Sequence, residues 1–222
     1  MTVLRHRLAV PIAISGTLAA VHLGAQAVGA ERVADLSQMT LMPALAGVLL
    51  RATERPRTPV VRWTLAALGC SWLGDTVPRY LPQDSAAQLG AMLGSFALAQ
   101  IAYLAAFRPW RLRSVLARPW GAAPYVLLAV AVVALCAPGA GPLLPAVVLY
   151  AGLLAAMAAL ATGLGPLGTI GGASFLVSDA LIALRVFGVL DRPGQDVAFM
   201  ATYLAAQALL VAAVIRAEDP PD

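Results

Sequence analysis

Two aspartates stand inside long apolar stretches of the sequence, Asp75 in SWLGDTVP and Asp179 in SFLVSDALIA. A charged side chain near the bilayer centre costs about 2.5 to 3.5 kcal/mol on insertion scales, so such residues are usually retained for function. Two carboxylates in a low-dielectric pocket do not ionise equally, because desolvation and mutual repulsion keep one protonated. One aspartate can then donate a proton while the other remains an anion. This division of roles suits the acid-catalysed cleavage of ethers and acetals.

Both aspartates lie at a similar depth along their stretches, about 15 residues in for Asp75 and about 12 for Asp179, at roughly 1.5 Å per helical residue. The sequence therefore predicts that they face one cavity, and it favours the deeper Asp179 as the acid. Each also has a structural alternative. Asp75 lies one turn before Pro78 and could be a solvated helix end or a cap. Asp179 could be a hydrogen-bonding residue between helices. Arg185, six positions further on, points to a different helix face from Asp179.

Other polar side chains in the apolar stretches are candidates for holding a substrate. Ser71 and Asp75 are four residues apart, as are Tyr203 and Gln207, so each pair shares a helix face. Each of these residues is also typical of hydrogen bonding between helices. The predicted substrate-binding residues are Gln38, Gln100, Tyr103, Tyr150, Ser178, Tyr203 and Gln207.

The remaining chemistry-bearing residues exclude several classes of enzyme. There are only two histidines and two cysteines, and the cysteines, Cys70 and Cys136, form no CxxC pair. A zinc site built on three histidines is therefore excluded, and the sequence predicts no metal. No Ser-His-Asp set, phosphate loop or dinucleotide fingerprint is present, so no cofactor is predicted.

The composition indicates the setting in which these residues work. The 222 residues are 60% hydrophobic and only 12% charged, whereas soluble domains carry about 25% charged residues. Lipid cannot satisfy exposed backbone groups, so spans of about 30 Å must be helical. The sequence therefore predicts an all-α, polytopic integral membrane protein with about eight transmembrane helices, at residues 8–30, 36–50, 60–77, 86–107, 121–137, 143–162, 167–187 and 197–215. The connecting loops are short, so residues 1–222 are predicted to form a single transmembrane domain.

The arginines predict how the chain is oriented, and all 15 basic residues are arginine. With the N-terminus inside, 11 of them fall in cytoplasmic segments, only Arg32, Arg79 and Arg192 fall outside, and Arg185 lies near the outer end of the seventh stretch. The positive-inside rule then predicts both termini in the cytoplasm. The richness in Ala, Gly, Pro and Arg favours a bacterial cell membrane as the location. No basic stripe interleaved with aromatic residues is present, so nucleic-acid binding is not expected.

The first apolar stretch follows Arg5 and Arg7 and ends in AQAVGA, which resembles a signal peptide with a small-residue cleavage site. A signal-peptide core is usually about 7 to 15 residues long, and this stretch is longer. A retained helix is therefore favoured.

The landmarks in chain order resemble the YhhN family of membrane proteins, whose characterised members are lysoplasmalogenases. The matching pieces are LMPAL, LGDT, AMLGSFALAQIAYLAAF, VVLYAGLLAAMAALA, GGASFLVSDALIA and YLAAQALL. The resemblance implies cleavage of the vinyl ether of a lysoplasmalogen in the bilayer, giving a fatty aldehyde and a glycerophospho-ethanolamine or -choline. It also implies that Asp75 and Asp179 are catalytic and that Tyr103 belongs to the site.

The resemblance has two departures. Family members often have a Lys-Pro pair where this chain has Gln38 and Met39, and many have His where it has Gln100. The second stretch thus lacks a cation that could bind a phosphate. The sequence also leaves open a protein that binds or transports a lipid or small molecule without hydrolysing it, or a hydrolase of another ether, an epoxide or a lysolipid.

Overall fold

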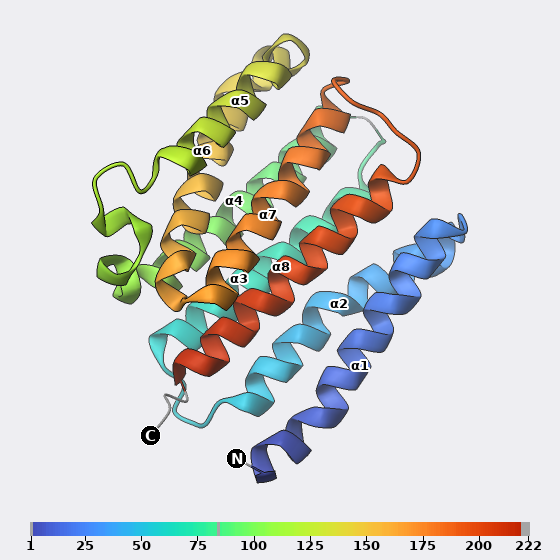
Figure 1. Cartoon of the computed structure of the whole chain (residues 1–222). Coiled ribbons are helices and arrows are strands. Elements are labelled where there is room, and N and C mark those ends of the chain that lie inside the picture. Colours follow the sequence, from blue (N-terminus) through green and yellow to red (C-terminus); the bar gives the residue numbers. More distant parts are fainter. Residues whose placement is uncertain (1, 84, 219–222) are drawn as a thin grey trace. The chain divides into compact units, whose positions relative to one another are not determined.

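Every predicted apolar stretch is an α-helix in the computed structural model, which describes residues 2–83 and 85–218 (Figure 1). No strand occurs in this described part, so the all-α prediction is confirmed. The helices are α1 (Thr2–Ala27), α2 (Glu31–Ala52), α3 (Pro59–Thr76), α4 (Ala86–Phe107), α5 (Ala123–Ala140), α6 (Leu144–Ala161), α7 (Pro166–Val186) and α8 (Gln195–Glu218). Short 3-10 turns connect several of them.

Six stretches of the described residues are long and apolar enough to cross a membrane. They are Leu8–Ala27, Glu31–Ala52, Ala86–Arg113, Ala123–Leu164, Pro166–Val186 and Gln195–Glu218. Ala123–Leu164 contains both α5 and α6, whereas α3, which carries Arg62 and Asp75, is not among the six. The chain is therefore a multi-pass membrane protein.

The helix ends follow from local sequence signals. Thr58 caps α3, its hydroxyl accepting a hydrogen bond from the backbone of Val61, and Pro59 occupies the first turn, where no amide donor is needed. The second helix begins five residues earlier than predicted. Gly29, at φ 70°, turns the chain, and Glu31 then opens α2 with a negative charge near the helix N-terminus.

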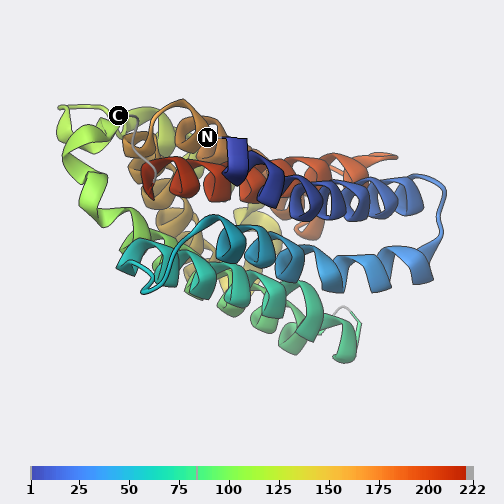
Figure 2. The ribbon, with the colours of Figure 1, turned by 90° about the horizontal axis from the view of Figure 1, so that it is seen from below.

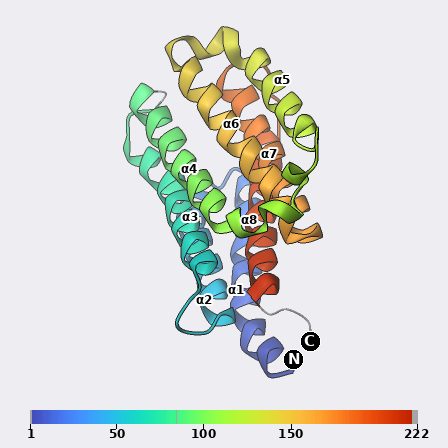
Figure 3. The same ribbon diagram turned by 90° about the vertical axis from the view of Figure 1, so that its left-hand side faces the viewer.

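The chain divides into two compact units. The first comprises Met1–Ala102 and Val214–Asp222. Within it, α1 and α2 form an antiparallel pair joined by a short turn, as Figure 2 shows. α3 packs on α2, and α3 and α4 run side by side (Figure 3). They approach so closely at Gly74 that a Cβ there would lie 2.8 Å from the ring of Phe96.

The second unit is Tyr103–Ala213. Its centre is the hairpin of α6 and α7, against which α5 packs. A Cβ on Gly172 of α7 would lie 2.9 Å from the Cα of Ala158 on α6. The glycine therefore allows the two backbones to approach more closely than any larger residue would permit.

Candidate active site

Asp75 lies at the end of α3 on the face that this helix buries. The face recurs every three to four residues along the helix, as an α-helix requires, and includes Thr64, Leu68, Ser71 and Gly74. Only 9% of Asp75 is exposed. The solvated helix end that the sequence allowed as an alternative is thus not what the structure shows.

Gln38 of α2, one of the predicted substrate-binding residues, is brought to Asp75. Its side-chain Nε2 donates a hydrogen bond of 3.2 Å to Asp75 Oδ1. The two residues are 37 positions apart in sequence. The packing of α2 on α3 therefore joins two residues that sequence reasoning had selected separately.

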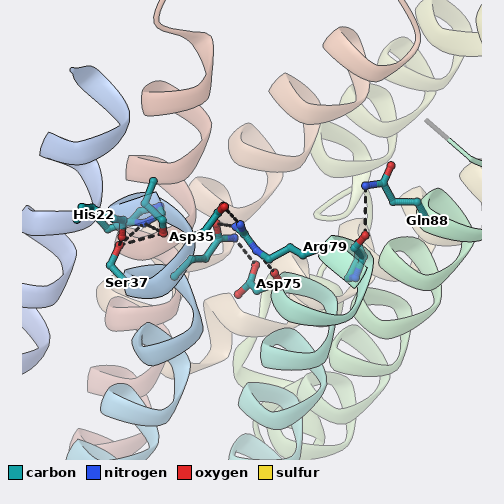
Figure 4. A network of polar contacts seen from close by, with 10 residues as sticks. His22, Asp35, Ser37, Asp75, Arg79 and Gln88 are labelled. Carbon is teal, nitrogen blue, oxygen red and sulfur yellow. Dashed lines mark hydrogen bonds and ion pairs between the residues drawn. The ribbon is translucent and has the colours of Figure 1, made fainter. Parts of the chain in front are cut away.

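Arg79, which follows α3 in the 3-10 turn Val77–Tyr80, extends this contact into a network (Figure 4). Its Nε donates to the backbone carbonyl of Asp75 at 2.9 Å. Its two terminal nitrogens donate to the amide oxygen of Gln38 and to the carboxylate of Asp35. Partial burial lowers the pKa of the Arg79 guanidinium, although an arginine remains charged in proteins.

The network fixes which way the Gln38 amide faces. Its oxygen must turn toward the guanidinium of Arg79, because a guanidinium has only donors to offer. The amide nitrogen is then left to face Asp75, which is the arrangement observed. The sequence analysis placed Arg79 in an outer loop, and it included neither Arg79 nor Asp35 among the predicted site residues. The spacing of four residues between Asp75 and Arg79 was the available signal, since it puts them on one side of a continuing helix.

Two further hydrogen bonds hold the helices around Asp75 in register. The indole of Trp72 donates to the backbone carbonyl of Met39 at 2.9 Å, which ties α3 to α2 beside the Gln38 contact. The amide of Gln88 on α4 donates to the carbonyl of Pro78 at 3.2 Å. The surroundings of Asp75 are therefore fixed from both neighbouring helices.

His22 joins α1 to α2 through a second polar cluster, at one side of Figure 4. Its Nδ1 lies 3.0 Å from the carbonyl of Ala34 and 3.0 Å from the hydroxyl of Ser37. The ring is fully buried, and among the described residues its Nε2 has no hydrogen-bond partner. We read this cluster as a contact between helices, since a buried histidine is best stabilised by such bonds.

Gln100 of α4 is also fully buried. Within residues 2–83 and 85–218, neither its amide oxygen nor its amide nitrogen has a hydrogen-bond partner. A buried polar group without a partner costs about 1–3 kcal/mol. Gln100 therefore has hydrogen-bonding capacity that the described protein groups leave unused.

Asp179 belongs to the second unit, where it is half-buried on α7. The hydroxyl of Tyr150 on α6 donates a hydrogen bond to its Oδ2. Two turns away, Gly172 and Ala158 bring the same two helices together. Tyr150 and Asp179 were predicted as site residues independently of each other. The close approach of α6 and α7 brings their side chains into contact.

The other predicted residues of the second unit form a buried cluster on α4, α7 and α8. The hydroxyl of Tyr103 donates to the amide oxygen of Gln207. The ring of Tyr103 meets the edge of Phe175 with centroids 6.5 Å apart, and Phe175 meets Tyr203 at 5.6 Å. Ser178 donates to the backbone carbonyl of Phe199 at 2.9 Å, a bond that fastens α7 to α8.

Arg185, which the sequence placed on a different face from Asp179, makes ion pairs near the end of α7. Its Nε lies 3.7 Å from Asp191, and a terminal nitrogen contacts Asp196. All three side chains are partly or largely exposed, so these pairs contribute at most about 1 kcal/mol each.

These features define an all-helical, multi-pass membrane protein in which two aspartates within apolar helices each accept a hydrogen bond from a neighbouring helix. The model of the YhhN family matches residues 33–214, and the chain belongs to that family. The match begins just after the start of α2 and thus leaves α1 outside it. The sequence matches no curated protein and no solved structure at a significant level.

Proposed function

We propose that this protein hydrolyses the vinyl ether bond of lysoplasmalogens, releasing a fatty aldehyde and a glycerophospho-ethanolamine or -choline. The observation that carries the proposal is that each aspartate accepts a hydrogen bond from a polar side chain of a neighbouring helix, Asp75 from Gln38 and Asp179 from Tyr150. An aspartate in an apolar helix is costly, and a hydrogen bond from a neighbouring helix helps to hold its side chain in place. Membership of the YhhN family, together with the resemblance to lysoplasmalogenases, supplies the reaction class.

The chemistry needs one proton donor and one anion. A proton is added to the vinyl carbon that is not bonded to oxygen, which gives an oxocarbenium ion. Water then adds to the cation, and the hemiacetal breaks its C–O bond to leave an aldehyde and an alcohol. The second carboxylate stabilises the cation and takes a proton from the water.

The partners suggest how the roles divide. The phenol of Tyr150 can either donate or accept a hydrogen bond, so it can hold Asp179 both before and after a proton leaves. Gln38 presents only its amide donor to Asp75, which suits an aspartate that remains an anion. We therefore assign the proton donor to Asp179 and the stabilising carboxylate to Asp75.

Gln100 is the best supported of the proposed substrate contacts. Its buried amide has an unused donor and an unused acceptor among the described groups, and a substrate hydroxyl or phosphate oxygen would satisfy them. Tyr103, Gln207 and Ser178 instead have protein partners, so we assign them to holding the helices in place.

The decisive experiment incubates the purified chain with a lysoplasmalogen and measures aldehyde release. Turnover supports the hydrolase, whereas saturable binding without aldehyde would favour a lipid-binding or transport protein. A panel of other ethers, an epoxide and an ester lysolipid separates the remaining hydrolase classes. A chain that is active only on the ester or the epoxide would contradict the proposal.

We further propose that all eight α-helices cross a bacterial cell membrane, with both termini in the cytoplasm. α3 is 18 residues long, which at 1.5 Å per residue gives about 27 Å, close to the hydrocarbon thickness of about 30 Å. The distribution of arginines supports the orientation, although the side chains of Arg5 and Arg7 lie outside the described part.

Arg79 is expected to act through Gln38 as a positioning residue. In an active chain, Arg79→Met should lower kcat about tenfold, the size of a typical coupling between neighbouring groups, because the Gln38 amide is then free to rotate. Arg79→Lys should restore only part of the rate, since an ammonium does not reproduce the planar set of donors.

A double-mutant cycle checks this role. Gln38→Leu alone should also lower kcat, and adding Arg79→Met to it should cost little more, because the residue through which Arg79 acts is already gone. Arg32→Met, at an exposed arginine in the first turn of α2, serves as the control and should leave the rate unchanged. Multiplicative losses in the double variant would show that Arg79 acts independently of Gln38.

A further inference from the structure

The chain between α4 and α5 carries an unusual combination of charge and exposed apolar surface. We call residues 108–121 the basic segment; their sequence, RPWRLRSVLARPWG, holds four arginines and no acidic residue. Those arginines, all exposed, are Arg108, Arg111, Arg113 and Arg118. Leu112, which lies between two of them, is 77% exposed, and Trp120, two residues after the last, is 88% exposed.

The basic segment is held in a fixed shape. It consists of two 3-10 turns, Arg108–Arg113 and Val115–Ala117, joined at Ser114, whose buried hydroxyl accepts a hydrogen bond from Leu116. The backbone amide of Val115 donates to the hydroxyl of Thr162 at 2.9 Å. The carbonyl of Trp110 lies 2.5 Å from the place where a Cβ on Gly163 would be, so the segment fits closely against the connection between α6 and α7.

This anchoring places the basic segment at a membrane face. It begins in the last six residues of Ala86–Arg113, a stretch apolar enough to span a membrane. It also contacts the 3-10 turn Thr162–Leu164, at which two further apolar stretches meet. In Figure 1 the segment is the green chain beside the end of α6 at which α7 begins. On the proposed topology, its exposed side chains lie at the depth of the lipid headgroups.

Trp120 supports the same conclusion independently. Its φ is 64°, a region that a bulky residue rarely occupies, and the next residue, Gly121, lies so close to Val115 that a Cβ there would clash with its carbonyl. The backbone thus takes a strained turn that leaves the indole exposed rather than buried. Tryptophan prefers the membrane–water interface, where its ring is in the acyl boundary and its N–H among the headgroups.

We propose that the basic segment is a binding surface for anionic phospholipids. Four arginines without a compensating acid attract negatively charged headgroups, and each guanidinium can bind a phosphate through two nitrogens. The exposed leucine and tryptophan side chains enter the apolar layer beneath the same headgroups. The partner is thus a lipid surface, and this assignment does not depend on the hydrolase activity.

Fluorescence quenching of Trp120 tests the proposal. The full chain is reconstituted in vesicles of phosphatidylglycerol and phosphatidylcholine, with bromine on the acyl chains of only one of the two lipids. The signal of Trp120 is taken as the difference between the wild type and Trp120→Phe. Brominated phosphatidylglycerol should quench this signal roughly twofold more than an equal amount of brominated phosphatidylcholine, given the attraction of several arginines.

Two matched variants make the result specific. Replacing the four arginines of the basic segment with glutamine should make the two lipids quench equally. The control replaces four other exposed arginines of the predicted cytoplasmic side with glutamine, at Arg51, Arg55, Arg62 and Arg216, and it should keep the preference. Equal quenching in the wild type would overturn the proposal, as would a preference that survives the first replacement or is lost equally in the control. Circular dichroism verifies that each variant retains its helices.

Discussion

Replacing either Asp75 or Asp179 with asparagine should reduce aldehyde release from a lysoplasmalogen by about 10²- to 10⁴-fold, the range for loss of a general acid or base. Asparagine keeps the shape of the side chain and its ability to accept a hydrogen bond from Gln38 or Tyr150. It can neither deliver a proton to carbon nor stabilise a cation as an anion does. The measurement is kcat for purified variants, with helix content and elution volume compared with the wild type.

The exposed Asp191 provides the matched control, because its carboxylate pairs only loosely with Arg185 and lies outside α7. Asp191→Asn should retain the full rate. Near-normal turnover in Asp75→Asn or Asp179→Asn would remove that aspartate from the mechanism. A loss in only one of them would leave a single-acid mechanism in place of the proposed pair.

Gly172→Ala should destabilise the protein by about 1–3 kcal/mol, the usual cost of overpacking. The added methyl would stand 2.9 Å from a backbone atom of α6, and backbone cannot move aside as the end of a side chain can. The helices must then separate, which also pulls Tyr150 away from Asp179. We expect a lower thermal midpoint in detergent and, in an active chain, a lower kcat.

Gly152→Ala, on α6, is the control that separates the clash at Gly172 from the general effect of replacing a helical glycine with alanine. Nothing lies within 4 Å of a Cβ at that position. Alanine is the better helix former by about 0.8–1.0 kcal/mol, so Gly152→Ala should leave stability unchanged or raise it. If the two variants behaved alike, the close approach at Gly172 would not be what holds α6 to α7.

The helices were predictable because a helix that crosses lipid needs a long run of apolar residues. All eight of these runs are visible in the sequence. The ends were less clear. α2 begins at Glu31, and its first turns are polar enough to resemble a loop, since Arg32 and Asp35 face outward there. Polar residues at the end of a spanning helix follow no apolar pattern, so sequence reasoning placed the start too late.

The partners of the two aspartates were harder to predict than the aspartates themselves. A charge in an apolar run is visible in sequence, but Gln38 and Asp75 are 37 residues apart, and only the rotation of α2 against α3 decides that they touch. The role of Arg79 depends on the chain continuing as a 3-10 turn past Pro78, where a loop was expected. His22 and Ser37 likewise meet across a turn whose geometry depends on Gly29.

The modest hydropathy of α3 has a consequence for how the protein enters the bilayer. This helix carries Asp75, and among the eight helices of residues 2–83 and 85–218 it is the one that falls in none of the sufficiently apolar stretches. On the proposed topology, α3 would be inserted poorly on its own, because each charged residue opposes transfer from the translocon into lipid. Hydrogen bonds from Trp72 to Met39 and from Gln38 to Asp75 would offset this by letting α2 and α3 enter together. On the proposed mechanism and topology, the aspartate that takes part in the reaction would thus also make insertion of α3 depend on a neighbouring helix.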